Sequence, residues 1–303
     1  MSEPPPRREP SSPSELRFVR EPQRTSALLQ ENQPMLTPTE RLNRDIRNAA
    51  TRLSDNEVRH LVDGYYIMQK NRMRADAQVR SMGGEPHEIL DWLSHQSFLL
   101  EEQVKEALNI YTMSHPIGEW MRSINGIGPI TAAGLLAHID ITKCTSVGDI
   151  WRFAGLDPTN KWERGKKRPW NATLKTVCFH IGISFIRYHG KKSSYYQKVY
   201  QDRRKLETER NEAGLFAKQA ADILERFKYS KSTVAYKCYS KGQLPPAHIV
   251  ARARRYAVKL FLSHLFEVWY EHHHRCKPPL PYPIAFLEGH DDYLKPLMNG
   301  EER

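Results

Sequence analysis

The sequence predicts an all-α protein, in which a helical bundle or coiled-coil arm precedes a helical domain that contains a helix-hairpin-helix. Apolar residues recur at helical spacing through most of the chain. We find no set of alternating segments that would indicate strands, and no repeat at periods of about 20–50 residues. Together these observations favour packed helices over a sheet or a repeat architecture.

Composition and pattern divide the chain into five segments. Residues 1–36 are rich in Pro, Ser, Glu and Arg and lack an apolar period, so they are predicted to form a disordered tail. Residues 37–113 are predicted to form the helical bundle or coiled-coil arm. The remaining segments are a helix-hairpin-helix domain (114–190), long helices that pack on it (191–275) and an extended, proline-rich C-terminal tail (276–303).

The N-terminal helices are predicted from capping residues and glycines. Thr37 or Thr39 is a candidate N-cap for a first helix, and Ser54 begins a second helix that Gly83 and Gly84 close. A third helix is predicted over residues 86–111.

Further helices are expected in the C-terminal half. Ser146 and Asn171 are predicted to cap two short-to-medium helices. A long charged helix from residue 193 is expected to continue through Gly214 to residue 227. Residues 228–246 read as a loop or short turns, and an apolar helix follows over 247–273.

Composition bounds the partners and the compartment. The 303 residues carry a formal net charge of +11, which suits a polyanionic partner. No segment approaches the roughly 20 apolar residues of a membrane span, and the N-terminus lacks the apolar core of a secretory signal. Cys144, Cys178, Cys238 and Cys276 form no CxxC pair, which favours reduced thiols. We therefore expect a cytoplasmic, nucleoid-associated protein that does not bind membranes.

The stretch 123–140 carries the strongest functional pattern. Gly126 and Gly128 allow a tight turn, and Pro129 suits the first position of a helix. Exposed amides at a helix N-terminus can bind one phosphate of a nucleic-acid backbone without reading bases. The alternative is a connection that only packs. The predicted contacts are Gly126, Ile127, Gly128 and Thr131.

The positive charge is concentrated after this turn. Residues 161–210 hold fourteen Lys or Arg and four Asp or Glu. Trp162 and Trp170 lie within the basic stretch, where aromatic rings can stack on bases or enter a groove. The alternative is a solvated loop whose tryptophans fill the core. The predicted nucleic-acid contacts are Lys161, Arg164, Lys166, Lys167, Arg168, Trp170, Asn171 and Lys175.

The sequence predicts no catalytic residue, no metal ligand and no cofactor. No Ser-His-Asp spacing, P-loop or Rossmann glycine pattern is present. His138 and His180 lie on apolar helices and are expected to be core residues. Groups considered as metal ligands, but read as helix-end and surface residues, are His272, His273, His274, Cys276, Asp140, Asp149 and Asp157.

The ordered motifs over about residues 120–190 resemble the C-terminal domain of the DEDD-type insertion-sequence transposases, which a bridge RNA guides. The helix-hairpin-helix comes first, and the run 154–158 (Ala-Gly-Leu-Asp-Pro) matches the family's second element. Asn171, Leu174 and Lys175 match its Gly-Asn-x-x-Leu-Arg element, with Lys for Arg. The resemblance implies mobile-element descent and a DNA or structured-RNA partner.

Two departures from the family concern its composite active site. The nucleophilic serine would fall between Pro158 and Gly165, where Thr159 is the only hydroxyl. Residues 37–113 read as helical and not as a RuvC-like domain with its four acidic residues, so Mg²⁺ is expected only if the protein is catalytic. We therefore predict a homo-oligomeric DNA-binding protein without a complete catalytic site of its own. An active transposase, with Thr159 or a partner subunit supplying the missing groups, and a helical scaffold stay open as alternatives.

Overall fold

The computed structural model describes residues 41–83, 88–187, 194–280 and 294–296, and every regular element within these ranges is a helix. All described residues lie in one compact unit of the chain, Thr39–Arg303. The predicted all-α class is confirmed. The helices are α1 (Arg44–Ala50), α2 (Asp55–Ser81), α3 (Glu88–Met113), α4 (Pro116–Ser123), α5 (Pro129–His138), η2 (Ile141–Lys143), α6 (Val147–Phe153), α7 (Ala172–Arg187), α8 (Tyr195–Glu212), α9 (Ala217–Arg226), α10 (Val234–Tyr239) and α11 (Pro246–His274).

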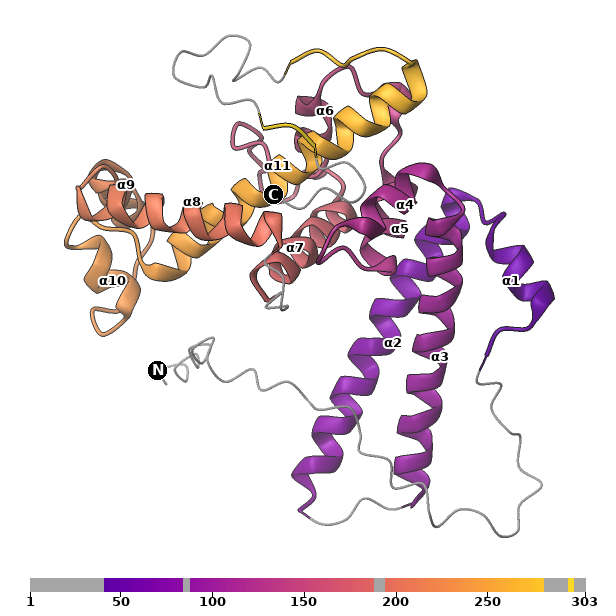
Figure 1. Cartoon of the computed structure of the whole chain (residues 1–303). Helices are drawn as coiled ribbons and strands as arrows, with labels where there is room; N and C mark the ends of the chain where they lie inside the picture. Colours follow the sequence, from indigo (N-terminus) through magenta and orange to yellow (C-terminus); the bar gives the residue numbers. More distant parts are fainter. Residues whose placement is uncertain (1–40, 84–87, 188–193, 281–293, 297–303) are drawn as a thin grey trace. The chain divides into compact units, whose positions relative to one another are not determined.

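The helices α2 and α3 lie side by side as a long pair (Figure 1). Ser54 caps α2 as predicted. Its side chain accepts from the Glu57 amide and the Glu57 side chain accepts from the Ser54 amide, which forms a capping box. The first helix is shorter than predicted, because α1 begins at Arg44 with Asn43 as its N-cap. Thr37 and Thr39 lie outside the described residues.

Apolar burial between α2 and α3 is confined to one end of the pair. Val58 and Val62 of α2 are fully buried, as is Leu108 of α3. Farther out, the buried Glu101 carboxylate accepts from Arg72, whose Nε lies 2.8 Å away. The outer half of the arm is therefore held by an ion pair more than by a hydrophobic core.

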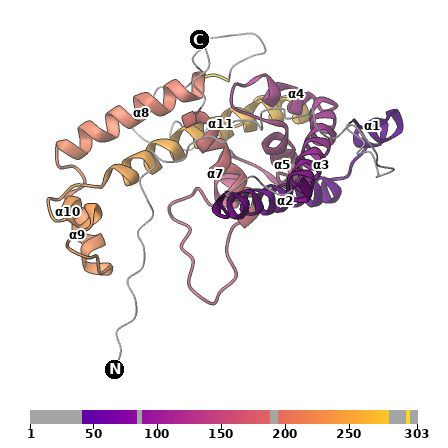
Figure 2. The same cartoon turned by 90° about the horizontal axis from the view of Figure 1, so that it is seen from below.

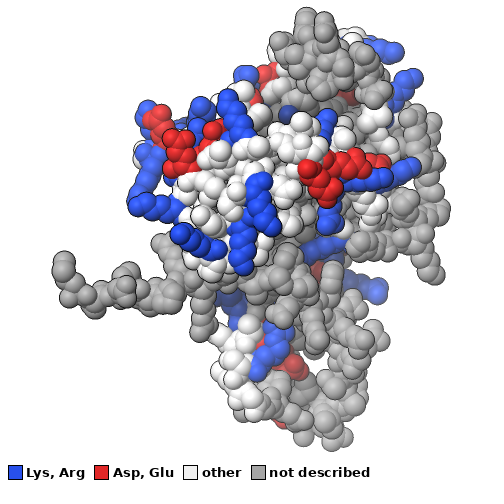
Figure 3. Space-filling model, turned by 90° about the vertical axis from the view of Figure 1, so that its left-hand side faces the viewer, with Lys and Arg blue, Asp and Glu red and all other residues white. Residues whose placement is uncertain are grey.

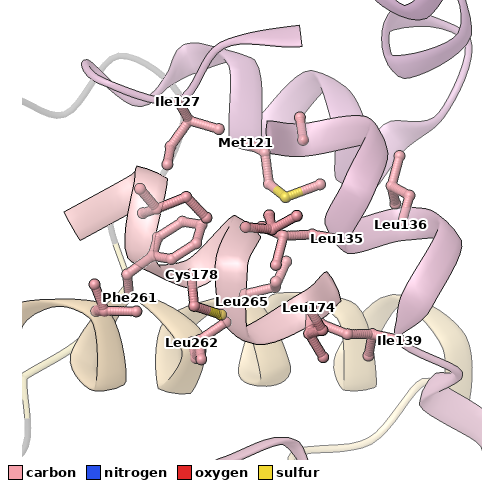
Figure 4. Packing of buried hydrophobic residues seen from close by; sticks show 14 of the residues in the cluster. Met121, Ile127, Leu135, Leu136, Ile139, Leu174, Cys178, Phe261, Leu262 and Leu265 are labelled. Atoms are coloured by element: carbon pink, nitrogen blue, oxygen red, sulfur yellow. The ribbon is translucent and has the colours of Figure 1, made fainter. Parts of the chain in front are cut away.

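The core gathers around α5, which is buried on nearly all sides (Figure 4). Gly134 lets α5 approach α7 closely, because a Cβ there would lie 3.1 Å from the Val177 side chain. Phe261, Leu262 and Leu265 of α11 close the core from the other side of α7. The apolar run of 247–273 is thus a core helix, as its pattern predicts.

The prediction of one helix running through Gly214 is wrong. Gly214 has φ +78°, a left-handed conformation that ends α8, and α9 begins at Ala217. Residues 228–246 also contain more structure than predicted, since Thr233 caps the short helix α10. A second, smaller hydrophobic cluster joins α9, α10 and the start of α11 through Ala220, Tyr239, Leu244 and Ile249.

The helices α8 and α11 pack along one another and share one buried carboxylate (Figure 1). Glu207 is fully buried and lies 2.6 Å from nitrogens of both Arg203 and Arg252. Burial opposes its charge, but these two arginines hold the pKa of Glu207 below its usual value. None of the described helices is both long and apolar enough to cross a membrane.

Candidate nucleic-acid interface

The turn 124–128, at which the sequence predicts a helix-hairpin-helix, joins α4 to α5. Gly126 has φ +99°, which favours glycine. The carbonyl of Gly126 accepts from the Ser184 hydroxyl at 2.7 Å, and that of Asn125 accepts from the Ser194 hydroxyl at 3.2 Å. Ile127 is buried and anchors the turn to the core (Figure 4). The carbonyl side of the turn is therefore fixed against α7 and the start of α8.

The first amides of α5 have no side-chain cap. Gly128 is the N-cap of α5 and has no side chain to cap the helix. The first backbone hydrogen bond of α5 runs from the Ala132 amide to the Gly128 carbonyl, so Ile130 and Thr131 have no intrahelical acceptor. A Cβ at Gly128 would meet nothing within 4 Å. Open space thus lies beside Gly128, at the positive end of the α5 helix dipole.

Arg122 is a basic residue at this turn that the sequence pattern alone does not mark as functional. Its guanidinium donates to the carbonyl of Ile127 across the turn. Arg122 makes no ion pair with a carboxylate of the described residues, and burial lowers its pKa. A half-buried positive charge therefore lies at the turn. The signal in the sequence was its position near the end of the helix that enters the turn.

The basic stretch forms a loop, residues 154–170, whose two ends meet. The Asn171 amide donates to the Phe153 carbonyl at 2.9 Å, which closes the loop. Asn171 also caps α7 as predicted, accepting from the Leu174 amide at 2.9 Å. Figure 2 shows the loop projecting away from the helices. Its basic side chains are consequently exposed, and they are Lys161, Arg164, Lys166, Lys167 and Arg168.

The tip of this loop is ordered by its own contacts. The Trp162 ring nitrogen donates to the Lys166 carbonyl at 2.7 Å, and Arg168 lies over the Trp162 ring. The Lys166 ammonium lies 2.6 Å from a carboxylate oxygen of Glu163, and both side chains are about 70% exposed. Lys166 is thus partly neutralised, whereas Lys161, Lys167 and Arg168 have no carboxylate partner among the described residues.

Trp170 is seated at the base of the loop. A Cβ on Gly155 would lie 2.9 Å from the Trp170 ring and 3.0 Å from Lys175, so only glycine leaves room. The Lys175 ammonium sits 4.1 Å from the centre of the Trp170 ring. Burial and the charges of Arg168 and Arg255 lower the pKa of Lys175. Trp170 is half-buried and Trp162 is exposed, so the alternative in which both fill the core does not hold.

The two predicted groups lie at opposite ends of α7. The hairpin turn contacts Ser184 near the C-terminus of α7, whereas the basic loop enters its N-terminus at Asn171. The Asn171 amide group also lies 3.2 Å from His138 at the end of α5, so α5 and α7 run antiparallel. At 1.5 Å per residue, the two groups are separated by about 20 Å along the helix axis.

The three aspartates considered as metal ligands have local structural roles. Asp140 caps η2 and pairs with Lys143, and Asp149 accepts from the amides of Thr145 and Ser146 at the start of α6. Asp157 accepts from the amide and hydroxyl of Thr159. Within the described ranges, no group of His, Cys, Asp or Glu has the geometry of a metal site.

The comparison with known families bears on the same stretch. Residues 118–197 match the model of the Transposase IS116/IS110/IS902 family. This match spans α4, the hairpin turn, α5, α6, the basic loop, α7 and the start of α8. No curated protein matches the chain. The resemblance expected from the motifs is therefore confirmed, since residues 118–197 are similar to the domain that this family model describes.

Proposed function

We propose that the protein binds the backbone of duplex DNA at two places, the hairpin turn and the basic loop. The observation that carries this proposal is the N-terminus of α5, where the amides of Ile130 and Thr131 have no intrahelical acceptor and Gly128 supplies no side-chain cap. Arg122 adds a positive charge at the same turn, because its guanidinium donates to the Ile127 carbonyl. The family match supports a DNA partner for residues 118–197.

The separation of the two groups fits one duplex. A distance of about 20 Å corresponds to roughly six base pairs at 3.4 Å each. The hairpin would hold one phosphate, while the loop neutralises several phosphates farther along. Neither contact reads a base edge, so binding is expected to be tolerant of sequence and steeply dependent on salt. Duplexes shorter than about six base pairs should engage only one of the two groups.

Substituting Gly128 tests the hairpin without damaging the fold. Gly128 has φ −88° and open space at Cβ, so other residues fit there, and Asp is a favourable N-cap. Gly128→Asp should raise the melting temperature slightly, because its carboxylate accepts from the first amides of α5. It should also repel phosphate and lower duplex affinity by about tenfold or more.

Gly128→Asn is the matched control, because it caps the helix without a charge. Duplex affinity is expected to be highest with Gly128, lower in Gly128→Asn and lowest in Gly128→Asp. Thermal stability is expected to be lower with Gly128 than in either capped variant. If Gly128→Asp leaves duplex affinity unchanged, the hairpin turn is not part of the duplex-binding interface. An RNA duplex of the same sequence, tested alongside, distinguishes a structured-RNA partner from a DNA partner.

We further infer that the α2–α3 arm joins two copies of the chain. Its outer half exposes large apolar side chains although they lie on long amphipathic helices, a pattern typical of an unpartnered helix face. Light scattering across a concentration series should show a dimer, and charged substitutions at two arm positions should give a monomer. The exposed residues are Ile67, Met73, Met82, Ile89, Trp92, Leu93 and Leu100.

Strand transfer is the competing function. Thr159 is the hydroxyl nearest the family's serine position, and its Oγ1 lies 2.7 Å from an Asp157 carboxylate oxygen. The hydrogen bonds from the Thr159 amide and hydroxyl lower the pKa of Asp157, which makes that carboxylate a weak base. We therefore expect neither nicks nor covalent adducts when supercoiled DNA and Mg²⁺ are supplied. Nicking that Thr159→Ala abolishes would establish the catalytic alternative.

A further inference from the structure

A row of cation–aromatic pairs extends the basic loop across the exposed face of α7 to α11. Arg168 lies over Trp162, Lys175 lies over Trp170, and the Arg254 guanidinium lies 4.2 Å from the centre of the Phe179 ring. Lys175 and Phe179 are one helical turn apart on the same face of α7. We propose that this row, which we call the α7–α11 face, binds a single-stranded nucleic acid by stacking its bases and neutralising its phosphates.

Close packing of the two helices builds this face. A Cβ on Gly182 would lie 2.6 Å from Cγ of Arg254, so the absence of a side chain on α7 lets the arginine stem cross it. This crossing places the Arg254 guanidinium over the Phe179 ring. Phe179 nevertheless stays 48% exposed, so a large part of its ring faces solvent. An aromatic platform held from one side by a cation is thus available to a base.

The positive charges of this face are not compensated. Lys175, Arg254 and Arg255 make no ion pair with a carboxylate of the described residues. Burial lowers the pKa of all three, and neighbouring arginines lower it further. Mutual repulsion of this kind is relieved when a polyanion binds. The charges therefore favour a nucleic acid over a neutral or cationic ligand.

The exposed aromatic rings favour a single strand over a duplex as the ligand of this face. A duplex presents phosphates outward and keeps its bases stacked inside, so exposed Phe179 and Trp162 would add little to its binding. Unpaired bases stack on such rings, and each stacking contact contributes about 5-fold to 100-fold in affinity. This inference deepens the proposed function and depends on its basic loop, but it adds a substrate class and residues that duplex binding does not use.

The test compares Phe179→Ala with Phe227→Ala, a matched loss of an exposed phenylalanine at the end of α9. The probes are an oligothymidylate and an oligouridylate of about 20 nucleotides and a DNA duplex of equal length. Phe179→Ala should weaken binding of the single strands by about 5-fold or more and change duplex affinity by less than about 2-fold. Phe179→Tyr should restore single-strand binding, whereas Phe227→Ala should leave all three affinities unchanged.

The outcomes separate this inference from the proposed function. If wild-type protein binds duplex and single strands but Phe179→Ala weakens neither, or both equally, the α7–α11 face is not a stacking platform. If wild-type protein does not bind the single strands at all, this inference is also wrong. If Gly128→Asp leaves duplex affinity unchanged while Phe179→Ala still weakens single-strand binding, only the proposed hairpin contact fails. The oligothymidylate and oligouridylate arms tell whether DNA or RNA is the preferred strand.

Discussion

The hydroxyl of Ser184 donates a hydrogen bond of 2.7 Å to the carbonyl of Gly126 and thereby ties the hairpin turn to α7. This contact joins residues 58 positions apart in sequence. It occupies a carbonyl of the turn and fixes the turn against α7. The orientation of the proposed phosphate site therefore depends on a side chain outside the hairpin motif.

Ser184→Ala should loosen the turn. Losing this hydrogen bond should lower the free energy of unfolding by about 1 kcal/mol, because the half-buried Gly126 carbonyl loses its partner. Duplex affinity should fall with it. Ser263→Ala is a matched control, because its hydroxyl donates to a helix carbonyl at 3.0 Å, far from the hairpin in sequence. Equal effects of the two substitutions on duplex affinity would contradict a positioning role for Ser184.

Replacing Lys166, Lys167 and Arg168 with Ala should flatten the salt dependence of duplex binding. Each lost phosphate contact lowers the slope of log K against log salt by about 0.9. Because Lys166 is paired with Glu163, we expect a decrease of about two units, not three. The slope is measured by fluorescence anisotropy over a salt series.

The control for this triple variant lies on a different surface. Figure 3 shows Lys and Arg spread over the side that carries α9 and α10. Lys228, Lys231 and Lys237 are exposed there and carry the same total charge. Their substitution by Ala should change the slope by less than one unit. A slope that falls equally in both triples would indicate attraction by net charge, without a defined site.

Gly155→Ala should disturb the seat of Trp170. Gly155 has φ +64°, and a Cβ would collide with the Trp170 ring. Gly214→Ala is the matched control, because Gly214 also has positive φ but meets nothing within 4 Å. We expect about 1–2 kcal/mol of destabilisation for the control and a larger loss for Gly155→Ala, measured by urea unfolding. Only Gly155→Ala should lower nucleic-acid affinity, and equal losses would refute the packing argument.

Acid should destabilise the protein through His264. This residue is buried, hydrogen-bonds to Tyr196 and to the Leu294 carbonyl, and burial lowers its pKa to about 4. The unfolded chain, with a pKa near 6.5, binds the proton more readily, so stability falls as the pH drops from about 6.5 towards 4. The loss amounts to about 3 kcal/mol at most.

His264→Asn should reduce this pH dependence, which is measured from unfolding midpoints at several pH values. His138, His180 and His248 also have lowered pKa values, caused mainly by burial, so a smaller slope of the same sign should persist in the variant. A variant with the full wild-type slope would show that His264 does not carry the effect.

The sequence predicts an element correctly where the interaction that determines it spans only a few residues. Ser54 and Asn171 cap their helices as expected, because a cap needs only its own side chain and the next three amides. Gly214 was misread because helix-forming residues flank it on both sides. The break there is accompanied by long-range bonds, in which the Asn211 side chain contacts both the amide and the carbonyl of Leu244.

The candidate site was only partly predictable for the same reason. The turn and the basic loop are continuous in sequence and were found. Arg122 and the pair of Phe179 with Arg254 were missed, because their roles depend on how a side chain crosses a turn or a neighbouring helix. Nothing in the local pattern says that Gly182 faces Arg254, which is 72 residues later in the chain.

The joined ends of the basic loop have a consequence for how this protein can change over time. The Asn171 amide and the Phe153 carbonyl hold the two stems together, so insertions or deletions at the tip of the loop, residues 159–168, leave the helical framework undisturbed. Changes in the length or charge of this one protruding segment can therefore alter the affinity for a polyanion. Among relatives of this fold, variation in length and charge should concentrate in that segment, while the residues at its stems stay nearly invariant.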